Sequence, residues 1–473
     1  MLQIKFGTDG WRAIIAKDFT CENCQVVAQG IANYLNNVNL NKKGVIIGYD
    51  NRFMSKDFAE ECARVLVGNG IKVMLFKRAV PTPIAAFATR IKEAGGAMIV
   101  TASHNPPEYN GIKFIPDYAG PAMPEVTDSI EGEVNKVLNG GKVYRLNLEE
   151  AVQLDILERI DIDQQYINHV LKILKTEFFK EKKLRVVVNP MYGAGIGYLD
   201  KVLNVLDCEV KTINNYRDVL FGGSMPEPIE PILNDLKRAV ISYKADIGLA
   251  LDGDADRFGI VDDKGDFVSA NRIMYLLLDH LIKTRSFRGP ICRSIATTHM
   301  LDRIARRNGI DVIETPVGFK YIGDIMRQKG CMLGAEESGG LSIFGHIPEK
   351  DGILACLMVV EMLVYSGKTL TELSEELNAD YGNLVSERLD IRVSQQDKKQ
   401  IMGLLADYRP DSLNGIKVES NNNLEENKIV LVDGSWVLIR ASGTEPVVRI
   451  YIEANDTEKM EGIKAEVLKA LGL

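Results

Sequence analysis

The chain has 473 residues, of which 46% are hydrophobic and 26% are charged, a composition typical of a globular protein with sizeable cores. Its length predicts about three domains. The formal net charge of −8 argues against a nucleic-acid partner, although an acidic protein can still hold an anionic small molecule in a local basic pocket. No apolar run is long enough to span a bilayer and the first residues lack a signal-peptide pattern, so we expect a cytoplasmic protein with no membrane partner.

The seven cysteines are dispersed and odd in number, which fits reduced, buried thiols better than a disulfide framework. Cys21 and Cys24 form a CxxC pair, which can indicate a zinc or redox site. No second cysteine pair or Cys/His motif accompanies it, and the run from Cys21 to Leu35 has the pattern of a helix. We therefore interpret the pair as two cysteines of one helix.

The first hundred or so residues alternate between predicted strands and helices. The opening motif, Phe6-Gly-Thr-Asp-Gly-Trp-Arg12, predicts a tight turn because two glycines flank its aspartate. Arg12 is either a surface cation or, beside this turn, a phosphate ligand. A helix is expected from Ser55, a plausible N-cap, to Val67. Strands are predicted at residues 45–48, 73–76 and 96–100.

The third of these strands leads into Thr101-Ala-Ser-His-Asn-Pro106. Proline ends strand pairing, so Ser103 and His104 should lie in a loop at the carboxyl end of the strand, where open α/β sheets bind ligands. Ser103 is therefore a candidate for covalent chemistry, unless it only caps the end of the strand. The next segment, 126–171, is charged and mostly helical, and we place the first domain boundary within it.

Two further α/β segments follow. The second has a glycine-rich turn whose GxGxG spacing differs from the GxGxxG of dinucleotide-binding proteins, so we interpret it as a tight strand-to-helix turn. This segment ends with strand 246–251 and Asp252-Gly-Asp-Ala-Asp-Arg257. The third segment has strands at 291–295 and 331–333, followed by the loop Gly334–Gly340.

All three segments share one feature, which is a late, short apolar strand followed by a polar loop of small residues. The loops come after Val100, Leu251 and Leu333. This repeat predicts three related α/β domains that each deliver one loop to a shared site.

The C-terminal part differs, because its predicted strands at 390–393, 428–432, 436–440 and 447–452 are mixed with helices in the manner of a smaller α+β domain. The polar stretch Glu419–Asn427 is expected to be a loop. The expected domains are residues 1–153, 154–257, 258–371 and 372–473.

The second polar loop carries Asp252, Asp254 and Asp256, separated by single small residues. Carboxylates this close repel one another, so the cluster requires a divalent cation or strong cationic partners. An EF-hand would have glycine in place of Arg257 and glutamate in place of Asp263, which excludes that motif. A sheet-edge loop with three carboxylates suits Mg²⁺ and leaves coordination positions for phosphate, whereas the alternative is a solvated acidic turn.

Three other segments have ligand-binding patterns. Arg440-Ala-Ser-Gly-Thr-Glu-Pro446 joins two strands, and its arginine, hydroxyls and glycine form an anion nest rather than an ordinary hairpin. In the Gly334–Gly340 loop, acceptor and donor groups suit sugar hydroxyls, and Gly318-Phe-Lys320 offers a cation beside a flexible turn. The candidate binding residues are Arg440, Ser442, Gly443, Thr444 and Arg449 for phosphate, Glu336 and Ser338 for sugar hydroxyls, and Gly318 and Lys320 for the substrate without a more specific role.

Five motifs together resemble the α-D-phosphohexomutase superfamily, of the phosphoglucomutase/phosphomannomutase type, across essentially the whole chain. FGTDGWR, TASHNPxxYNGxKF, DGDADR, EESGG and RASGTEP occur in the order and spacing of that family. The resemblance implies three similar α/β domains with mixed sheets and a smaller, mobile C-terminal α+β domain around a central cleft. It implies a mutase that interconverts hexose 1-phosphate and hexose 6-phosphate.

The resemblance also assigns roles to residues. Ser103 would act as a phosphoserine, with Mg²⁺ held by its phosphate and by the three aspartates. Phosphoryl would pass to the sugar monophosphate, and the bisphosphate intermediate would reorient and return its other phosphate to Ser103. Arg12, Lys113 and Arg257 would stabilise phosphate charge, and Lys113 or His104 would move the hydroxyl proton. A glucose 1,6-bisphosphate-type activator is implied, and a homodimer is left open.

The identity of the sugar is narrowed by DGDADR, EESG and VGFK, which resemble the phosphoglucomutase and phosphomannomutase branches. The phosphoglucosamine branch tends to have glutamine where Glu337 stands and to lack the GFK lysine. Many relatives have histidine where this chain has Gly340. We expect glucose 1-phosphate, then mannose 1-phosphate, with phosphoglucosamine mutase as the alternative. A sugar phosphatase or a non-catalytic phosphosugar sensor is disfavoured by the phosphate nest and by the intact Ser103 and aspartate triad.

Overall fold

The computed structural model describes residues 4–7, 10–180, 182–422, 427–441 and 447–473. The backbone packs as two compact units. The first contains Met1–Ser294 and Ile310–Thr371, and the second contains Ile295–Gly309 and Glu372–Leu473.

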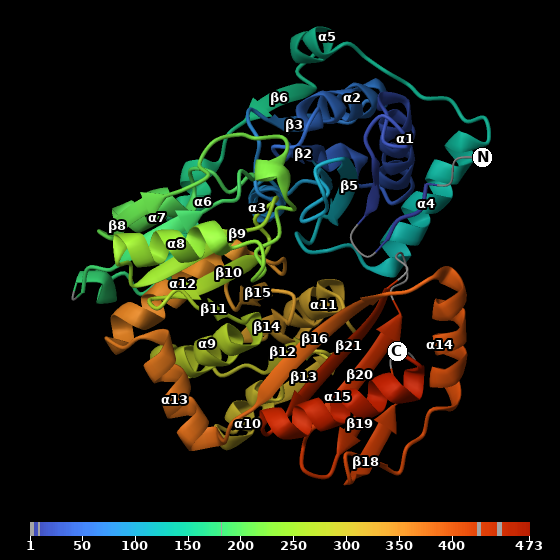
Figure 1. The fold of residues 1–473 in the computed structure, drawn as a ribbon. Helices are drawn as coiled ribbons and strands as arrows, with labels where there is room; N and C mark the ends of the chain where they lie inside the picture. The colour runs from blue at the N-terminus through green and yellow to red at the C-terminus, as the bar shows by residue number, and fades with distance from the viewer. Residues whose placement is uncertain (1–3, 8–9, 181, 423–426, 442–446) are drawn as a thin grey trace. The chain divides into compact units, whose positions relative to one another are not determined.

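The first unit begins with six strands: β1 (Trp11–Ile14), β2 (Val45–Tyr49), β3 (Val73–Phe76), β4 (Gly96–Val100), β5 (Tyr109–Pro116) and β6 (Leu157–Ile160). The helices that lie between them along the chain are α1 (Cys21–Asn37), α2 (Ser55–Gly68), α3 (Thr82–Ile91), α4 (Pro124–Leu138) and α5 (Leu148–Gln153). The strands form one mixed sheet in the order β1-β5-β4-β2-β3-β6. Figure 1 labels β2, β3, β5 and β6 of this sheet and the five helices. Strands β4, β2, β3 and β6 are parallel, and β5 pairs antiparallel with both β4 and β1.

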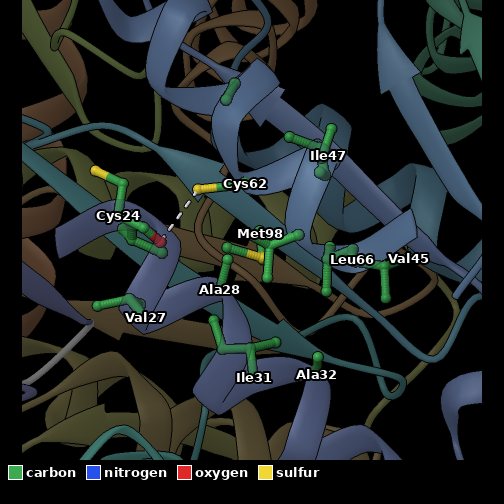
Figure 2. Close-up of a cluster of buried hydrophobic side chains, with 14 of the residues drawn as sticks. Cys24, Val27, Ala28, Ile31, Ala32, Val45, Ile47, Cys62, Leu66 and Met98 are labelled. Carbon is green, nitrogen blue, oxygen red and sulfur yellow. Dashed lines mark hydrogen bonds between the residues drawn. The ribbon is translucent and has the colours of Figure 1, made fainter. Parts of the chain in front are cut away.

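Helix α1 packs against α2 and α4 through a buried apolar face. Figure 2 shows part of this core, in which Val27 and Ile31 of α1 belong to one cluster with Met98 of β4. Cys24 and Cys62 are buried in the same cluster, and the Cys62 sulfur lies 3.8 Å from the Cys24 carbonyl oxygen. All seven cysteines are free thiols, and the CxxC pair lies on one helix as predicted.

Two more mixed sheets follow in the first unit. The strands of the second are β7 (Arg185–Asn189), β8 (Glu209–Thr212), β9 (Ile247–Leu251), β10 (Phe258–Asp262) and β11 (Phe267–Val268). Those of the third are β12 (Ile291–Ser294), β13 (Val312–Thr315), β14 (Leu333–Glu336) and β15 (Gly340–Ile343). The helices are α6 (Asp163–Ile173), α7 (Leu199–Val205), α8 (Asn234–Tyr243), α9 (Ala270–Thr284), α11 (Phe319–Lys329) and α12 (Gly352–Ser366).

The three sheets share one topology. Their orders β5-β4-β2-β3, β10-β9-β7-β8 and β15-β14-β12-β13 place the same parallel pairs beside the same antiparallel partner. Each polar loop singled out in the sequence joins a late parallel strand to that antiparallel partner. The predicted fold, three similar α/β domains with mixed sheets, is therefore confirmed.

The structure corrects two local predictions in this unit. Met54, with φ of +56°, is the N-cap of α2, and Ser55 is its first residue. The Ser55 hydroxyl does not cap the helix, because it donates to Asp50 Oδ1 (2.7 Å). Strand β14 starts at Leu333 rather than Cys331, so Glu336 is the last residue of the strand instead of a loop residue.

The short strand β6 lies in a segment predicted to be helical. Only its end residues, Leu157 and Ile160, are buried, and it forms because its backbone pairs with β3. The first sheet therefore continues past residue 153, the expected end of the first domain. In the same way β10 and β11 carry the second sheet past residue 257.

The second unit contains an antiparallel sheet in the order β16-β21-β20-β19-β18-β17, which confirms the smaller α+β domain. Its strands are β16 (Val385–Arg392), β17 (Ser412–Leu413), β18 (Ile416–Asn422), β19 (Asn427–Leu431), β20 (Trp436–Ala441) and β21 (Val447–Ala454). Its helices include α10 (Met300–Arg307), α14 (Gln395–Asp407) and α15 (Thr457–Leu471).

One sequence-based expectation for this unit is wrong. Residues 419–422, predicted as loop, belong to β18, which pairs with β19 across an irregularity between Val418 and Ser420. The segment Ile295–Gly309 packs with the C-terminal strands. Lys428 Nζ, for example, donates to the Ile295 carbonyl oxygen (2.8 Å).

Helix α12 is buried along nearly its whole length. No single helix among the described residues is long and apolar enough to cross a membrane, and α12 meets the criterion only together with α13 (Leu370–Tyr381), to which it is bent by 79°. Within α12, Glu361 is fully buried and accepts hydrogen bonds from Arg285 (2.8 and 3.0 Å) and from the Lys175 backbone N–H (2.6 Å). Its Oε1 lies 2.6 Å from His280 Nε2. Burial alone would raise the pKa of Glu361, but His280 and Arg285 hold it below the usual value.

We predict that Glu361→Ala lowers the free energy of unfolding by about 3–5 kcal/mol, because the half-buried Arg285 and the Lys175 N–H lose the buried carboxylate that accepts their hydrogen bonds. Urea denaturation would measure the change. The control is Asp235→Ala, which breaks an exposed ion pair with Arg238 and should cost less than about 1 kcal/mol. Equal losses in the two variants would contradict the prediction.

Candidate functional site

Ser103 lies in the β4–β5 loop and is 1% exposed. Its φ of +51° is unfavourable for a residue with a side chain, so the surrounding loop must hold it there. Its Oγ donates to Asp252 Oδ2 (2.9 Å) and lies 3.3 Å from His104 Nδ1. The hydroxyl of the first polar loop thus meets a carboxylate of the second.

The first and second loops are in direct contact at a glycine. A Cβ on Gly253 would lie 2.5 Å from the Ser103 carbonyl oxygen, so this close approach requires a residue without a side chain. Thr82, at the start of α3, holds the second loop through Asp254. Its N–H donates to the Asp254 carbonyl oxygen (2.9 Å) and its hydroxyl to Asp254 Oδ2 (2.6 Å).

The three aspartates of the β9–β10 loop are buried, with one carboxylate oxygen of each within 4.8 Å of the others. Lys113, from β5, donates to Asp254 Oδ2 (2.8 Å) and Asp256 Oδ2 (3.1 Å). Asp254 Oδ1 and Asp256 Oδ1 are buried and find no hydrogen-bond partner among the described residues. Unused carboxylate oxygens in a buried cluster fit a divalent cation of the Mg²⁺ type, and burial excludes the alternative of a solvated acidic turn.

The buried charges shift the protonation of the site. Burial, together with the charges of Asp256 and Asp254, raises the pKa of Asp252 well above its usual range. Burial would also raise the pKa of Asp256, but Lys113 and other nearby cations hold it below its usual range. The desolvated His104, beside cationic groups, has a pKa well below its usual value, so its imidazole is neutral near pH 7.

Arg257 follows the triad directly. Its backbone N–H donates to Asp252 Oδ1 (3.0 Å), and its guanidinium Nε lies 3.9 Å from Asp256 Oδ1. Burial would lower the pKa of Arg257, but Asp256 and Asp252 raise it, so the side chain stays a cation at any physiological pH. From β1, Arg12 donates to Asn105 Oδ1 (2.5 Å) and thereby reaches the loop of Ser103.

The third loop adjoins the second. Gly339 lies beside Phe258, since a Cβ there would be 3.1 Å from the Phe258 carbonyl oxygen. Glu336 is buried at the end of β14, and the buried Ser338 Oγ has no hydrogen-bond partner among the described residues. Three loops distant in sequence are thus brought together, as the repeat predicted.

The remaining predicted binding residues lie in several places. Gly318, with φ of +126°, precedes α11, on which Lys320 Nζ lies 5.2 Å from the centre of the Tyr321 ring. In the second unit, Arg440 of β20 pairs in register with Arg449 of β21. Ser442, Gly443 and Thr444 lie outside the described residues.

Lys350 and Glu349 are functional candidates that the sequence motifs did not include. Both are buried, and Lys350 Nζ lies 2.8 Å from Glu349 Oε1 and 3.5 Å from Asp256 Oδ2. A Cβ at Gly340 would be 2.7 Å from Lys350 Cδ, so the lysine occupies the space that a larger residue at 340 would need. The charged run Glu349-Lys-Asp351 between a buried strand and a buried helix is the signal that could have found them.

A second overlooked pair, Asp50 and Arg52, follows β2 directly and is buried. Polar residues after a buried strand are the signal that singled out Ser103, and the same rule would have found this pair.

Models of one protein family match nearly the whole chain. The phosphoglucomutase/phosphomannomutase alpha/beta/alpha domains I, II and III match residues 3–140, 164–265 and 269–381, and the C-terminal domain matches 391–470. The chain belongs to the phosphoglucomutase/phosphomannomutase family. It is therefore an enzyme, a mutase of the phosphohexomutase type.

Individual relatives agree with this assignment. A phosphoglucomutase/phosphomannomutase of Thermococcus kodakarensis is 31% identical over 96% of this chain and 95% of its own length. The phosphoglucosamine mutase of Carboxydothermus hydrogenoformans is 30% identical over 98% of both chains. The crystal structure of a putative phosphomannomutase from Thermus thermophilus superposes with a TM-score of 0.86, at 31% identity, over 100% of both chains.

We predict that Mg²⁺ stabilises the protein by about 2.7 kcal/mol at a concentration one hundred times its dissociation constant, because it binds the folded triad. In Asp254→Asn this gain should be largely lost, whereas Asp117→Asn, at an exposed position, should keep it. Without divalent cations, Asp252→Asn should unfold at a higher temperature than the natural protein near neutral pH, since it removes a carboxyl whose charged form is destabilised by burial and by Asp256 and Asp254. Differential scanning fluorimetry measures all four proteins. An unchanged Mg²⁺ response in Asp254→Asn would contradict the assignment.

Proposed function

We propose that this mutase interconverts hexose 1-phosphate and hexose 6-phosphate through a phosphoserine at Ser103. The hydrogen bond from Ser103 Oγ to Asp252 Oδ2 (2.9 Å) carries the proposal, because it places a hydroxyl against carboxylates suited to Mg²⁺. Bound by Asp252, Asp254, Asp256 and the phosphate on Ser103, Mg²⁺ would neutralise charge on the transferring phosphoryl group.

The first transfer breaks the bond between phosphorus and Ser103 Oγ and forms a bond from phosphorus to the free hydroxyl of the sugar monophosphate. Ser103 Oγ takes up a proton as its bond to phosphorus breaks, which restores the serine hydroxyl, and the proton of the sugar hydroxyl passes to a base. His104, neutral near pH 7 and 3.3 Å from Ser103 Oγ, is suited to accept it, and Lys113 is the other candidate. Lys113, Arg257 and Arg12 stabilise the phosphate charge. The reverse transfer of the other phosphate then regenerates phosphoserine and releases the isomer.

The sugar bisphosphate formed by the first transfer must be held in two orientations, one for each transfer. Glu336 and Ser338 are proposed to bind sugar hydroxyls, a role supported by the buried Ser338 Oγ that lacks a partner among the described residues. Gly318 and Lys320 are further proposed substrate-binding residues. The non-reacting phosphate is assigned to Arg440, Ser442, Gly443, Thr444 and Arg449.

Glucose 1-phosphate is the proposed substrate, followed by mannose 1-phosphate. Phosphoglucosamine mutase is the second candidate, because relatives at about the same identity carry either name. A glucose 1,6-bisphosphate-type activator and a homodimer belong to the same proposal.

We predict that Ser103→Ala lowers kcat at least about a thousandfold, since no other group can carry the phosphoryl between half-reactions. Isothermal titration should show that glucose 1-phosphate still binds within about threefold of the natural affinity, because the hydroxyl is not needed for binding. Ser242→Ala, an exposed serine of α8, is the control with unchanged kcat. Full activity in Ser103→Ala would refute the phosphoserine mechanism.

The choice of sugar is tested by comparing glucose, mannose and glucosamine 1-phosphates with Mg²⁺ and a trace of the corresponding bisphosphate. The proposal predicts the highest kcat/KM for glucose 1-phosphate. It also predicts isomer formation with little inorganic phosphate in the same reactions. A clear preference for glucosamine 1-phosphate would establish the second candidate instead.

A further inference from the structure

A buried ion pair lies behind the loop of Ser103. Asp50 and Arg52 are 2% and 0% exposed, and Arg52 Nε lies 3.2 Å from Asp50 Oδ2. They directly follow β2, which runs parallel to β4 with Tyr49 opposite Val100. The pair therefore stands next to the point where β4 ends and the serine loop begins.

Arg52 binds the backbone of the serine loop at several points. Its guanidinium donates to four carbonyl oxygens, those of Ser103 (2.6 Å), Asn105 (2.6 Å), Pro106 (2.8 Å) and Tyr109 (3.0 Å). The planar guanidinium of an arginine presents several N–H donors in a fixed geometry and can bind four acceptors at once. The single ammonium group of a lysine cannot.

Asp50 is connected to the backbone N–H of Ser103 through the hydroxyl of Thr101. The Thr101 hydroxyl donates to Asp50 Oδ2 (2.6 Å) and accepts from the Ser103 N–H (2.8 Å). The ion pair thus fixes both polar groups of the Ser103 backbone, the carbonyl through Arg52 and the N–H through Thr101. These bonds hold Ser103 at its unfavourable φ of +51°.

We propose that Asp50 and Arg52 are positioning residues for phosphoryl transfer, an inference that rests on the proposed role of Ser103. Neither is hydrogen-bonded to Ser103 Oγ. Their effect is on where that oxygen stands relative to Asp252. Each catalytic cycle adds and removes nearly two negative charges at Ser103, so a loop held only by its own turn would shift between the two states. A loop fixed at its backbone keeps one geometry in both.

The experiment compares Arg52→Lys and Thr101→Val with the natural protein, with kcat corrected for the folded fraction by circular dichroism. We expect kcat to fall about a hundredfold in Arg52→Lys and at least tenfold in Thr101→Val, because small displacements of reacting atoms are costly. KM for glucose 1-phosphate should change less than about threefold, since the loop backbone does not bind the sugar. Thr101→Ser keeps the hydroxyl and should retain kcat within about threefold.

A matched control separates positioning from stability. Arg285→Lys alters another arginine that binds a carboxylate and a backbone carbonyl, in the α9–α12 network, and should lower the unfolding temperature without changing kcat. If Arg52→Lys does not fold, the contrast between Thr101→Val and Thr101→Ser decides. Natural kcat in both Arg52→Lys and Thr101→Val, or equal losses in Thr101→Val and Thr101→Ser, would overturn the inference. Absence of turnover in the natural protein would instead refute the proposed function.

Discussion

Three buried carboxylates of like charge, with oxygens within 4.8 Å of one another, are the constraint on which the site depends. Such a cluster is stable only where cations and donors offset it. Lys113 comes from β5, Arg257 from the loop itself and Lys350 from the turn before α12. The offsetting charges are therefore contributed by all three α/β domains of the first unit.

One repeated topology makes this convergence possible. In each α/β domain the loop between a late parallel strand and its antiparallel partner emerges at the same place, so one arrangement serves for the serine, the aspartates and the sugar-binding candidates. The close approach of the first two loops depends on Gly253, where any side chain would collide with the Ser103 carbonyl. The second unit is an antiparallel sheet with its own core and contributes its candidates from β20 and β21.

The strands, the repeat and the serine and aspartate loops could be predicted because each is a local pattern of an apolar run followed by polar, small residues. The predictions that failed concern residues whose structure depends on partners remote in sequence. Ser55 has the local signature of an N-cap, yet Asp50 takes its hydroxyl. Strand β6 is extended because its backbone pairs with β3, and Lys350 lies at the site because it forms an ion pair with Asp256. No local rule shows which distant charge a residue will meet.

The central claim is that Ser103 gives its phosphate to a bound sugar and takes one back. The most direct test loads Ser103 with radioactive phosphate, isolates the labelled protein and mixes it with unlabelled glucose 1-phosphate and Mg²⁺ for a single turnover. The account predicts that the label leaves the protein at a rate no slower than kcat and appears in glucose bisphosphate and glucose 6-phosphate. Label that stays on Ser103, or that is released as inorganic phosphate without entering sugar, would contradict it.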